Sequence, residues 1–231
     1  MKFRVFIVFV LFIGIVLPGI SHAQNKVVVI PLDSGDCNCD QIPTVTSAGG
    51  RVWMDRNLGA LQVAESADDY RAYGWLYQWG RLADGHEDRG SDTTATLSSG
   101  NVPGHDDFIT TNTSPYDWRS TQYDYLWDPD TGINNPCPAG FRVPTTAEWD
   151  SERSSWNSGN ASGAFASPLK LVMAGFRNYD DGMVDDAGSY GAYWSSSYNG
   201  SGADYLGIFD SGAVIPFGSR AYGFSVRCIK D

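Results

Sequence analysis

The last third of the chain alternates hydrophobic and polar residues in short runs, a pattern that predicts β-strands. Gly, Ser, Asn and Asp separate the runs, as expected for strands joined by turns in an antiparallel sheet. The runs with this character read "LKLVMAGF", "GAYWSSS", "DYLGIF", "AVIPF" and "GFSVRCI". In the last run the period of two separates two faces, Phe224, Val226 and Cys228 on one and Ser225, Arg227 and Ile229 on the other.

A capping box predicts a helix in "GFRVPTTAEWDSERSSW". Thr145 can cap the first turn, and Glu148, three residues later, can return a hydrogen bond to the cap. Ala147, Trp149 and Trp156 are spaced for a partly buried face. With the strands, this helix predicts an α+β fold that has one or two helices, a twisted antiparallel terminal sheet and long irregular loops.

The middle of the chain carries less periodicity. "GGRVWMDRNLG" is typical of a turn followed by a strand, and "YGWLYQWGRL" of a buried aromatic segment. Residues 84–134 are rich in turn-forming residues, as in "DGHEDRGSDTT". A stretch of that length inside a domain is usually an insertion with a function of its own, or disordered.

The first residues predict export. Lys2 and Arg4 precede an apolar run and the small residues around Ala23, so we expect a signal peptide over residues 1–23 that is cleaved after Ala23. The apolar run is too short to span a membrane, and the nearest cysteine, Cys37, is too distant for a lipid anchor. Residues 24–43 then form a short strand, "KVVVIPL", and a polar linker, before a domain over residues 44–231.

Charge limits the partners. The formal net charge is −11 at pH 7, and removal of Lys2 and Arg4 makes it more negative by two charges. Binding to nucleic acid or to an anionic membrane needs Lys and Arg to replace counterions, so neither is an expected partner. An acidic surface of this kind keeps an exported protein in solution.

Four cysteines agree with an exported protein. Cys137 and Cys228 each border a strand-like segment, and a disulfide between them would stabilise the fold by about 4 kcal/mol through loop closure. Cys37 and Cys39 are too close in sequence for a relaxed mutual disulfide, which leaves a strained disulfide or an intermolecular one. A metal site is the less favoured alternative, because it would need more soft ligands than these two cysteines supply.

Six motifs in order resemble those of the Fibrobacter succinogenes major paralogous domain family. They are "VWMDRNLGA", "AYGWLYQWGRLADGHE", "NNPCPAGFRVPTTAEWD", "AGFRNYDDG", "YWSSS" and "GFSVRCIKD". The resemblance runs from about Thr44 to Asp231. It implies a C-type lectin-like domain on an exported bacterial protein, secreted, periplasmic or on the cell surface, with the chain ends close together in a sheet and a binding face on loops and late strands.

The same fold is distantly related to the formylglycine-generating sulfatase-modifying enzymes, which share a "GFR-x-P-T-x-A-E-W" element. Those enzymes need two reactive cysteines late in the chain, whereas here Cys228 is the only late cysteine and Cys137 is its expected structural partner. We therefore expect no enzymatic activity. His86 and His105 lie in Asp- and Gly-rich loops, and we interpret both as solvated loop histidines rather than catalytic bases.

Acidic loops make calcium a more reasonable metal than one bound by Cys37 and Cys39. Asp180, Asp181, Asp185 and Asp186 place hard oxygen ligands in residues 178–186, and residues 128–135 repeat the pattern. The alternative is that these acidic turns are simply solvated. The Glu-Pro-Asn and Gln-Pro-Asp motifs of calcium-dependent lectins are absent, which argues against sugar binding through calcium.

Tyr, Ser, Gly and Asn dominate the polar positions of the last strands, and these residues also dominate antibody combining sites. We therefore predict a surface that binds an unidentified protein or glycan. Its candidate residues are Tyr190, Tyr193, Tyr198, Asn199, Asp204, Tyr205, Asp210, Phe217, Ser219 and Tyr222. Alternation instead places Trp194, Leu206 and Ile208 in the core.

Two other hypotheses remain open for this exported protein, and the first is that a retroelement diversifies residues 195–222. No residue from Ser195 to Tyr222 is Lys, Glu, Gln, Met or Trp, the residue types that mutated AAC-type codons cannot encode. Relatives in the resembled family with "YWSS" and "GFSVRC" elements include variable proteins of diversity-generating retroelements. The other hypothesis is a structural component of an exported assembly, linked through Cys37 or Cys39.

Overall fold

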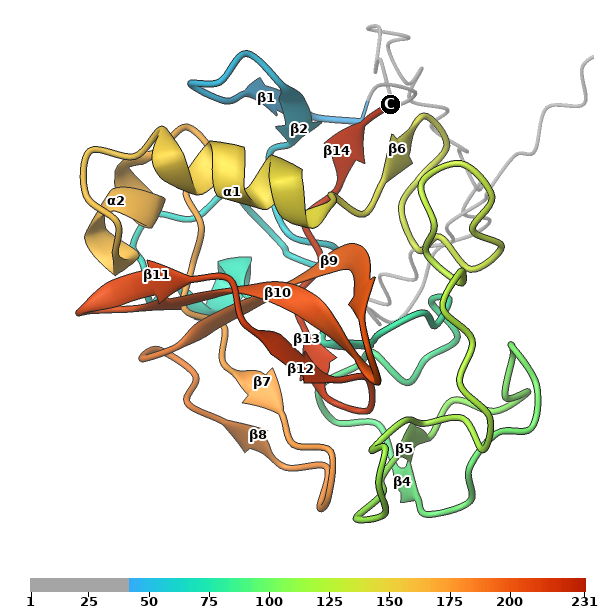
Figure 1. Cartoon of the computed structure of the whole chain (residues 1–231). Coiled ribbons are helices and arrows are strands. Elements are labelled where there is room, and N and C mark those ends of the chain that lie inside the picture. Colours follow the sequence, from blue (N-terminus) through green and yellow to red (C-terminus); the bar gives the residue numbers. More distant parts are fainter. Residues whose placement is uncertain (1–41) are drawn as a thin grey trace, which may run out of the picture. The chain divides into compact units, whose positions relative to one another are not determined.

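The computed structural model describes residues 42–231, in which short helices and strands are joined by long loops (Figure 1). The predicted signal peptide, the strand "KVVVIPL", Cys37 and Cys39 lie outside the described residues. Two α-helices and one short 3-10 helix are present in the described part, α1 (Thr146–Ser154), α2 (Ala161–Ala166) and η1 (Tyr70–Ala72). The predicted mixed α+β class is confirmed.

Three antiparallel four-stranded sheets carry most of the strands. In the first, the order is β1 (Thr44–Thr46), β2 (Val52–Met54), β14 (Ile229–Lys230) and β6 (Phe141–Arg142). In the second, β10 (Gly202–Phe209) pairs with β9 (Gly191–Asn199), β11 (Gly212–Val214) and β12 (Phe217–Ser219). In the third, the order is β3 (Tyr77–Gln78), β13 (Gly223–Phe224), β7 (Phe176–Arg177) and β8 (Val184–Asp185).

A parallel pair, β4 (Thr93–Thr94) and β5 (Phe108–Ile109), lies within the long middle segment. This segment is folded and contributes large buried side chains, so of the two alternatives for residues 84–134, an insertion or disorder, the structure contradicts disorder. Its buried apolar residues are Phe108, Ile109, Trp118, Leu126 and Trp127. Phe108 and Ile109 are buried as strand β5, whereas turns and loops carry Trp118, Leu126 and Trp127 inward.

The end of the chain is fixed between two earlier strands. Ile229 of β14 pairs with Trp53 of β2 and with Arg142 of β6. Next to it, Cys228 is bonded to Cys137, with 5.9 Å between the two Cα atoms. The predicted disulfide is thus confirmed, and it links the last strand to the loop that precedes β6.

The predicted capping box begins α1. The Thr145 hydroxyl accepts a hydrogen bond from the Glu148 backbone N–H, and the Glu148 carboxylate accepts one from the Thr145 N–H at 2.9 Å. Burial alone would raise the pKa of Glu148, but hydrogen bonds from Arg142 and Thr145 lower it to about 2. Trp149 is buried and Trp156 half-buried, as predicted, whereas Ala147 is exposed, so that part of the predicted face is wrong.

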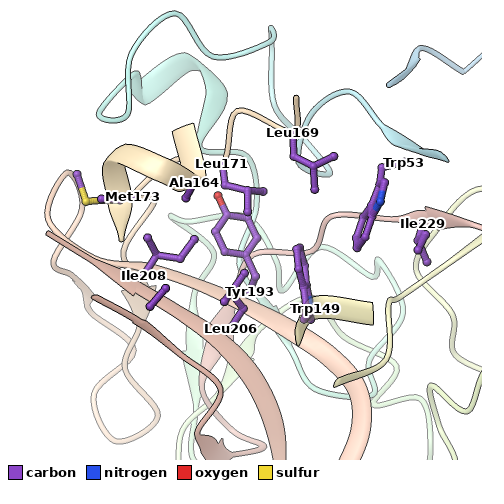
Figure 2. Packing of buried hydrophobic residues seen from close by; sticks show 12 residues of the cluster. Trp53, Trp149, Ala164, Leu169, Leu171, Met173, Tyr193, Leu206, Ile208 and Ile229 are labelled. Atoms are coloured by element: carbon purple, nitrogen blue, oxygen red, sulfur yellow. The ribbon is translucent and has the colours of Figure 1, made fainter. Parts of the chain in front are cut away.

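One core joins both helices to the long hairpin of β9 and β10 (Figure 2). Tyr193 of β9 lies at its centre, and its hydroxyl donates to the Val172 carbonyl at 2.7 Å and accepts from the Val172 N–H at 2.8 Å. The run "LKLVMAGF" was predicted to be a strand, yet only Phe176 belongs to one. The backbone of this run instead forms hydrogen bonds with the Tyr193 hydroxyl and with loop carbonyls, such as that of Ala67, which accepts from the Met173 N–H.

We predict that replacement of both Cys137 and Cys228 by Ala lowers the free energy of unfolding by about 4 kcal/mol. The bond closes a loop with a sequence separation of 91, and loss of it restores that chain entropy to the unfolded state. Urea unfolding of this variant and of the wild type, each with and without reductant, measures the difference. Reductant should destabilise only the wild type, and an equal response of both proteins would contradict the prediction.

Candidate ligand-binding site

Aromatic side chains surround a hollow of about 270 Å³ between the second and third sheets. Strands β7, β10, β12 and β13 and the residue before β9 contribute to it, and these elements lie together in Figure 1. We call it the aromatic pocket, and define it by its lining residues Phe176, Tyr190, Tyr205, Phe217, Gly218, Ser219, Tyr222 and Phe224.

Five rings of the aromatic pocket contact one another in a closed circuit. The circuit runs through Phe176, Tyr222, Phe224, Tyr205 and Tyr190, with ring centroids 4.6 to 6.1 Å apart at the four ring–ring contacts. The circuit closes where the Tyr190 hydroxyl donates to the Tyr205 hydroxyl at 3.2 Å. Phe176 makes edge-to-face contacts with Tyr190 and Tyr222, and Tyr222 stacks on Phe224; such contacts stabilise an aromatic cluster beyond the area that it buries.

Two glycines allow the rings to approach the strands. A Cβ atom on Gly218 would lie 3.1 Å from a ring carbon of Tyr205, and a Cβ atom on Gly207 would lie 2.6 Å from the Tyr190 hydroxyl oxygen. The approach at Gly207 is closer than real Cβ contacts, and the approach at Gly218 is tighter than most of them. Glycine in β10 and β12 therefore sets the depth of the aromatic pocket, a role that a strand pattern gives no sign of.

The hydroxyls of Tyr190 and Tyr222 in the aromatic pocket are neutral over the physiological range. Burial raises the pKa of Tyr222 to about 12, with further contributions from Tyr179, Tyr205 and nearby aspartates. Burial, and the hydrogen bond to Tyr205, raise the pKa of Tyr190 as well. These hydroxyls can therefore donate and accept hydrogen bonds, but they do not act as bases.

Half of the predicted ligand-binding residues meet in the aromatic pocket: Tyr190, Tyr205, Phe217, Ser219 and Tyr222. Phe217 is 66% exposed and stands at the pocket's edge, whereas the other four are partly buried. Tyr193 is 0% exposed and is part of the core in Figure 2, so the prediction that its side chain contacts a ligand is wrong. The predicted burial of Trp194, Leu206 and Ile208 is confirmed.

Three more predicted residues lie near the turn between β9 and β10, Tyr198 and Asn199 at the end of β9 and Asp204 within β10. Tyr198 is 46% exposed and packs edge-to-face on Tyr125, 6.0 Å between centroids. The Asn199 amide donates to Asp204, whose other carboxylate oxygen accepts from Thr146. Asp210 follows the opposite end of β10, so it belongs to neither group.

Sequence reasoning missed several aromatic residues of the aromatic pocket and of the surface around Tyr198. Phe176 and Phe224 line the aromatic pocket, and Tyr179 packs on Tyr222 at 4.6 Å. Near Tyr198, the exposed rings of Tyr123 and Tyr125 extend that surface. The motif "YDYLW" contained the signal for this second group, because alternating tyrosines in a loop are otherwise poorly accommodated in a core.

The acidic loop considered for calcium forms the turn between β7 and β8. The Asp181 carboxylate accepts from the Met183 N–H, and the Asp185 carboxylate from the Asn178 amide. Within residues 42–231, the only place where three His, Cys, Asp or Glu ligand atoms come within 4.8 Å of one another is Asp84, His86 and Glu87. Asp180, Asp181, Asp185 and Asp186 are therefore not gathered into a cluster of that kind.

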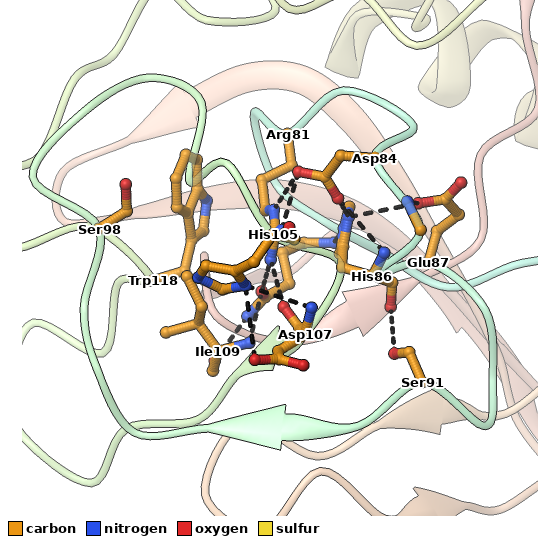
Figure 3. A network of polar contacts seen from close by, with 12 residues as sticks. Arg81, Asp84, His86, Glu87, Ser91, Ser98, His105, Asp107, Ile109 and Trp118 are labelled. Carbon is orange, nitrogen blue, oxygen red and sulfur yellow. Dashed lines mark hydrogen bonds and ion pairs between the residues drawn. The ribbon is translucent and has the colours of Figure 1, made fainter.

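His86 is 0% exposed, so the interpretation of this residue as a solvated histidine is wrong, while His105 is partly exposed as expected. His86 Nε2 accepts from the Gln78 N–H at 3.0 Å, and Nδ1 lies 2.6 Å from the Asp84 carboxylate (Figure 3). The accepting Nε2 requires the proton on Nδ1. Both ring nitrogens are thus engaged, and neither is left for a metal or for general-base chemistry.

The same network explains why this loop is buried. Asp84 also accepts two hydrogen bonds from the buried guanidinium of Arg81, at 2.8 and 3.2 Å. Arg81, Asp84 and His86 therefore all have hydrogen-bond partners, which is the condition for burying polar groups at a small cost in free energy. The sequence "DGHED" gives no sign of this, because Arg81 and Gln78 come from the preceding aromatic segment.

Comparison with known proteins adds no assignment: no family model, no curated protein and no solved structure matches the chain. Among residues 42–231, no helix has the length and hydrophobicity needed to cross a membrane.

We predict that stability declines as the pH falls from about 6.5 to 4 because of His86. Burial lowers the pKa of His86 to about 4 from its usual 6.5, against the opposing effect of Asp84. As the pH falls, the unfolded chain therefore takes up a proton on His86 before the folded chain does. The contribution of neutral His86 to the free energy of unfolding is complete above pH 6.5 and is lost toward pH 4, on the order of 3 kcal/mol in total. Glu148 titrates lower, so its contribution is lost only below about pH 4.5.

Urea unfolding between pH 7.5 and 4.5 measures this dependence. A His86→Gln variant keeps an acceptor for the Gln78 N–H and should be less stable at neutral pH, with a much flatter profile. His105→Gln is the matched control and should keep the wild-type slope. A wild-type slope in His86→Gln would show that another group is responsible.

Proposed function

We propose that this chain is an exported, non-catalytic protein that binds a protein or glycan ligand at the aromatic pocket. The convergence of five predicted contact residues from separate segments on one hollow of about 270 Å³ carries the proposal. Such hollows lined by aromatic groups with a few polar groups are typical of ligand sites. Export rests on the predicted signal peptide over residues 1–23.

A C-type lectin-like domain related to the Fibrobacter succinogenes major paralogous domain family is the architecture we propose for residues 44–231. Three features support it: the pairing of β2 with β14 near the two ends of this range, the disulfide that fixes the last strand, and a pocket on late strands. The motifs that carry the resemblance run along these residues from "VWMDRNLGA" to "GFSVRCIKD".

Sulfatase-modifying chemistry is the alternative function that we do not favour. It needs a pair of reactive thiols, whereas Cys228 is buried and bonded to Cys137. A hydrolase based on His86 is equally disfavoured, because both nitrogens of the ring have partners within the fold.

We predict that Phe217→Ala weakens ligand binding at least about tenfold, while its free energy of unfolding stays within about 0.5 kcal/mol of the wild-type value. The ring is mostly exposed, so its loss removes contact area from the aromatic pocket and little from the core. A protein and glycan array identifies the ligand, and titration of the variant measures the loss. Val214→Ala, an exposed residue on β11 of the same sheet, is the matched control and should bind normally.

Retroelement diversification is a narrower form of the proposal. Tyr205, Phe217, Ser219 and Tyr222 lie within residues 195–222, whereas Phe176, Tyr190 and Phe224 lie outside. A variable segment would thus change one side of the aromatic pocket over a constant base, in keeping with loops that vary on a rigid frame.

This narrower form predicts a template repeat matching the codons of residues 195–222 and a reverse transcriptase gene nearby. The genomic nucleotide sequence decides it, with the codons of residues 141–156, around α1, as an internal control that should have no repeat. Absence of the repeat would remove diversification and leave the binding function in place.

A further inference from the structure

We propose that the aromatic pocket recognises a quaternary ammonium group, of the trimethylammonium type, carried by its ligand. The inference rests on the proposed binding function and names the chemistry of the group that enters the site. Aromatic rings attract cations through the negative potential of their faces. Six of the eight lining residues are aromatic.

The arrangement of the rings is that of an enclosure rather than a flat platform. The plane of Phe176 is inclined by 89° to that of Tyr190 and by 82° to that of Tyr222. The planes of Phe224 and Tyr205 are inclined by 51°, whereas Tyr222 and Phe224 are stacked at 22°, so the rings face in several directions. Phe224 and Tyr205 complete the circuit, and Phe217 stands exposed at its edge. A rounded cation can touch several rings at once in such an enclosure.

No cation of the fold already occupies these rings. Elsewhere, arginines or a lysine lie over aromatic rings, such as Arg177 over Phe108 at 4.3 Å and Arg220 over Trp79 at 4.6 Å. Across residues 42–231, no such contact involves a ring of the aromatic pocket. The rings are thus without an internal partner for the interaction that the fold uses repeatedly.

Charge around the aromatic pocket favours a cation. The carboxylates of Asp180 and Asp185 act on the Tyr222 hydroxyl, and that of Asp186 acts on the Tyr190 hydroxyl, each raising the pKa of the tyrosine after the larger effect of burial. The protein as a whole carries a net charge of −11. A cationic ligand would therefore approach in a favourable field that salt weakens.

The lining distinguishes a quaternary from a primary ammonium. A primary ammonium has three N–H donors that need acceptors, and the lining residues include no carboxylate. Their side-chain acceptors are the hydroxyls of Tyr190, Tyr205, Tyr222 and Ser219, and the Tyr205 oxygen already accepts from Tyr190. A trimethylammonium group has no N–H to satisfy, so it loses little by leaving water and gains the ring contacts.

Titration calorimetry of the full chain with choline tests the proposal. Two probes serve as matched controls: 3,3-dimethylbutan-1-ol, the neutral carbon isostere of choline, and ethanolamine, its primary ammonium counterpart. Choline should bind saturably with a Kd on the order of 1 mM or lower, and both controls at least about tenfold more weakly. Equal binding of the neutral isostere or of ethanolamine, or no saturation with choline well above about 1 mM, would overturn the proposal.

Two substitutions locate the binding. Tyr222→Leu keeps apolar bulk but removes a ring, so choline affinity should fall about tenfold, and Phe217→Ala, on an exposed residue, should weaken it without unfolding the domain. Tyr70→Leu, on an exposed tyrosine of η1 outside the aromatic pocket, is the control. Undiminished choline binding by both pocket variants would place the cation elsewhere and overturn the proposal.

The result also separates this inference from the function it rests on. An array ligand that depends on Phe217, together with absent choline binding, leaves the binding function intact and removes the cation. If array ligands are bound equally by Phe217→Ala and wild type, the proposed function fails, whatever choline does.

Discussion

The placement of residues 220–230 is the constraint on which the rest of the structure depends. This one segment supplies Tyr222 and Phe224 to the aromatic pocket, β13 to the third sheet and β14 to the first. The bond between Cys228 and Cys137 and the pairing of Ile229 on both sides hold its end. A shift of this segment would therefore move the pocket walls and separate two sheets at once.

Buried arginines anchor the same segment. Arg227 is buried without a carboxylate partner among the described ion pairs, and it donates to the Asn57 side chain and the Leu169 carbonyl. Arg220 stacks over Trp79 and pairs with Asp124. Such groups tolerate little displacement, because a buried charge that loses its partners is costly. The segment is thus held firmly where the aromatic pocket begins, and Phe217, at the pocket's edge, is the most exposed lining residue.

Parts of this design could be predicted from local sequence. The helix from Thr146 to Ser154 follows from a cap and an acidic residue three positions apart, and the hairpin strands follow from alternation, since both signals span only a few residues. The run "LKLVMAGF" misled for the opposite reason. Its apolar residues are buried, but the partner of its backbone at Val172 is a tyrosine hydroxyl from β9, which no local pattern encodes.

The sequence by itself determined the fold class, the disulfide, the helix cap and the aromatic, polar character of the last strands. Only the tertiary structure decided which tyrosines enclose a hollow, which one fills the core, and that His86 is interior. Burial depends on what packs from distant parts of the chain: Tyr193 meets Val172, His86 meets Gln78, and Tyr190 meets Tyr205. Side-chain chemistry is written locally, whereas its solvent exposure is set by contacts that the chain makes only on folding.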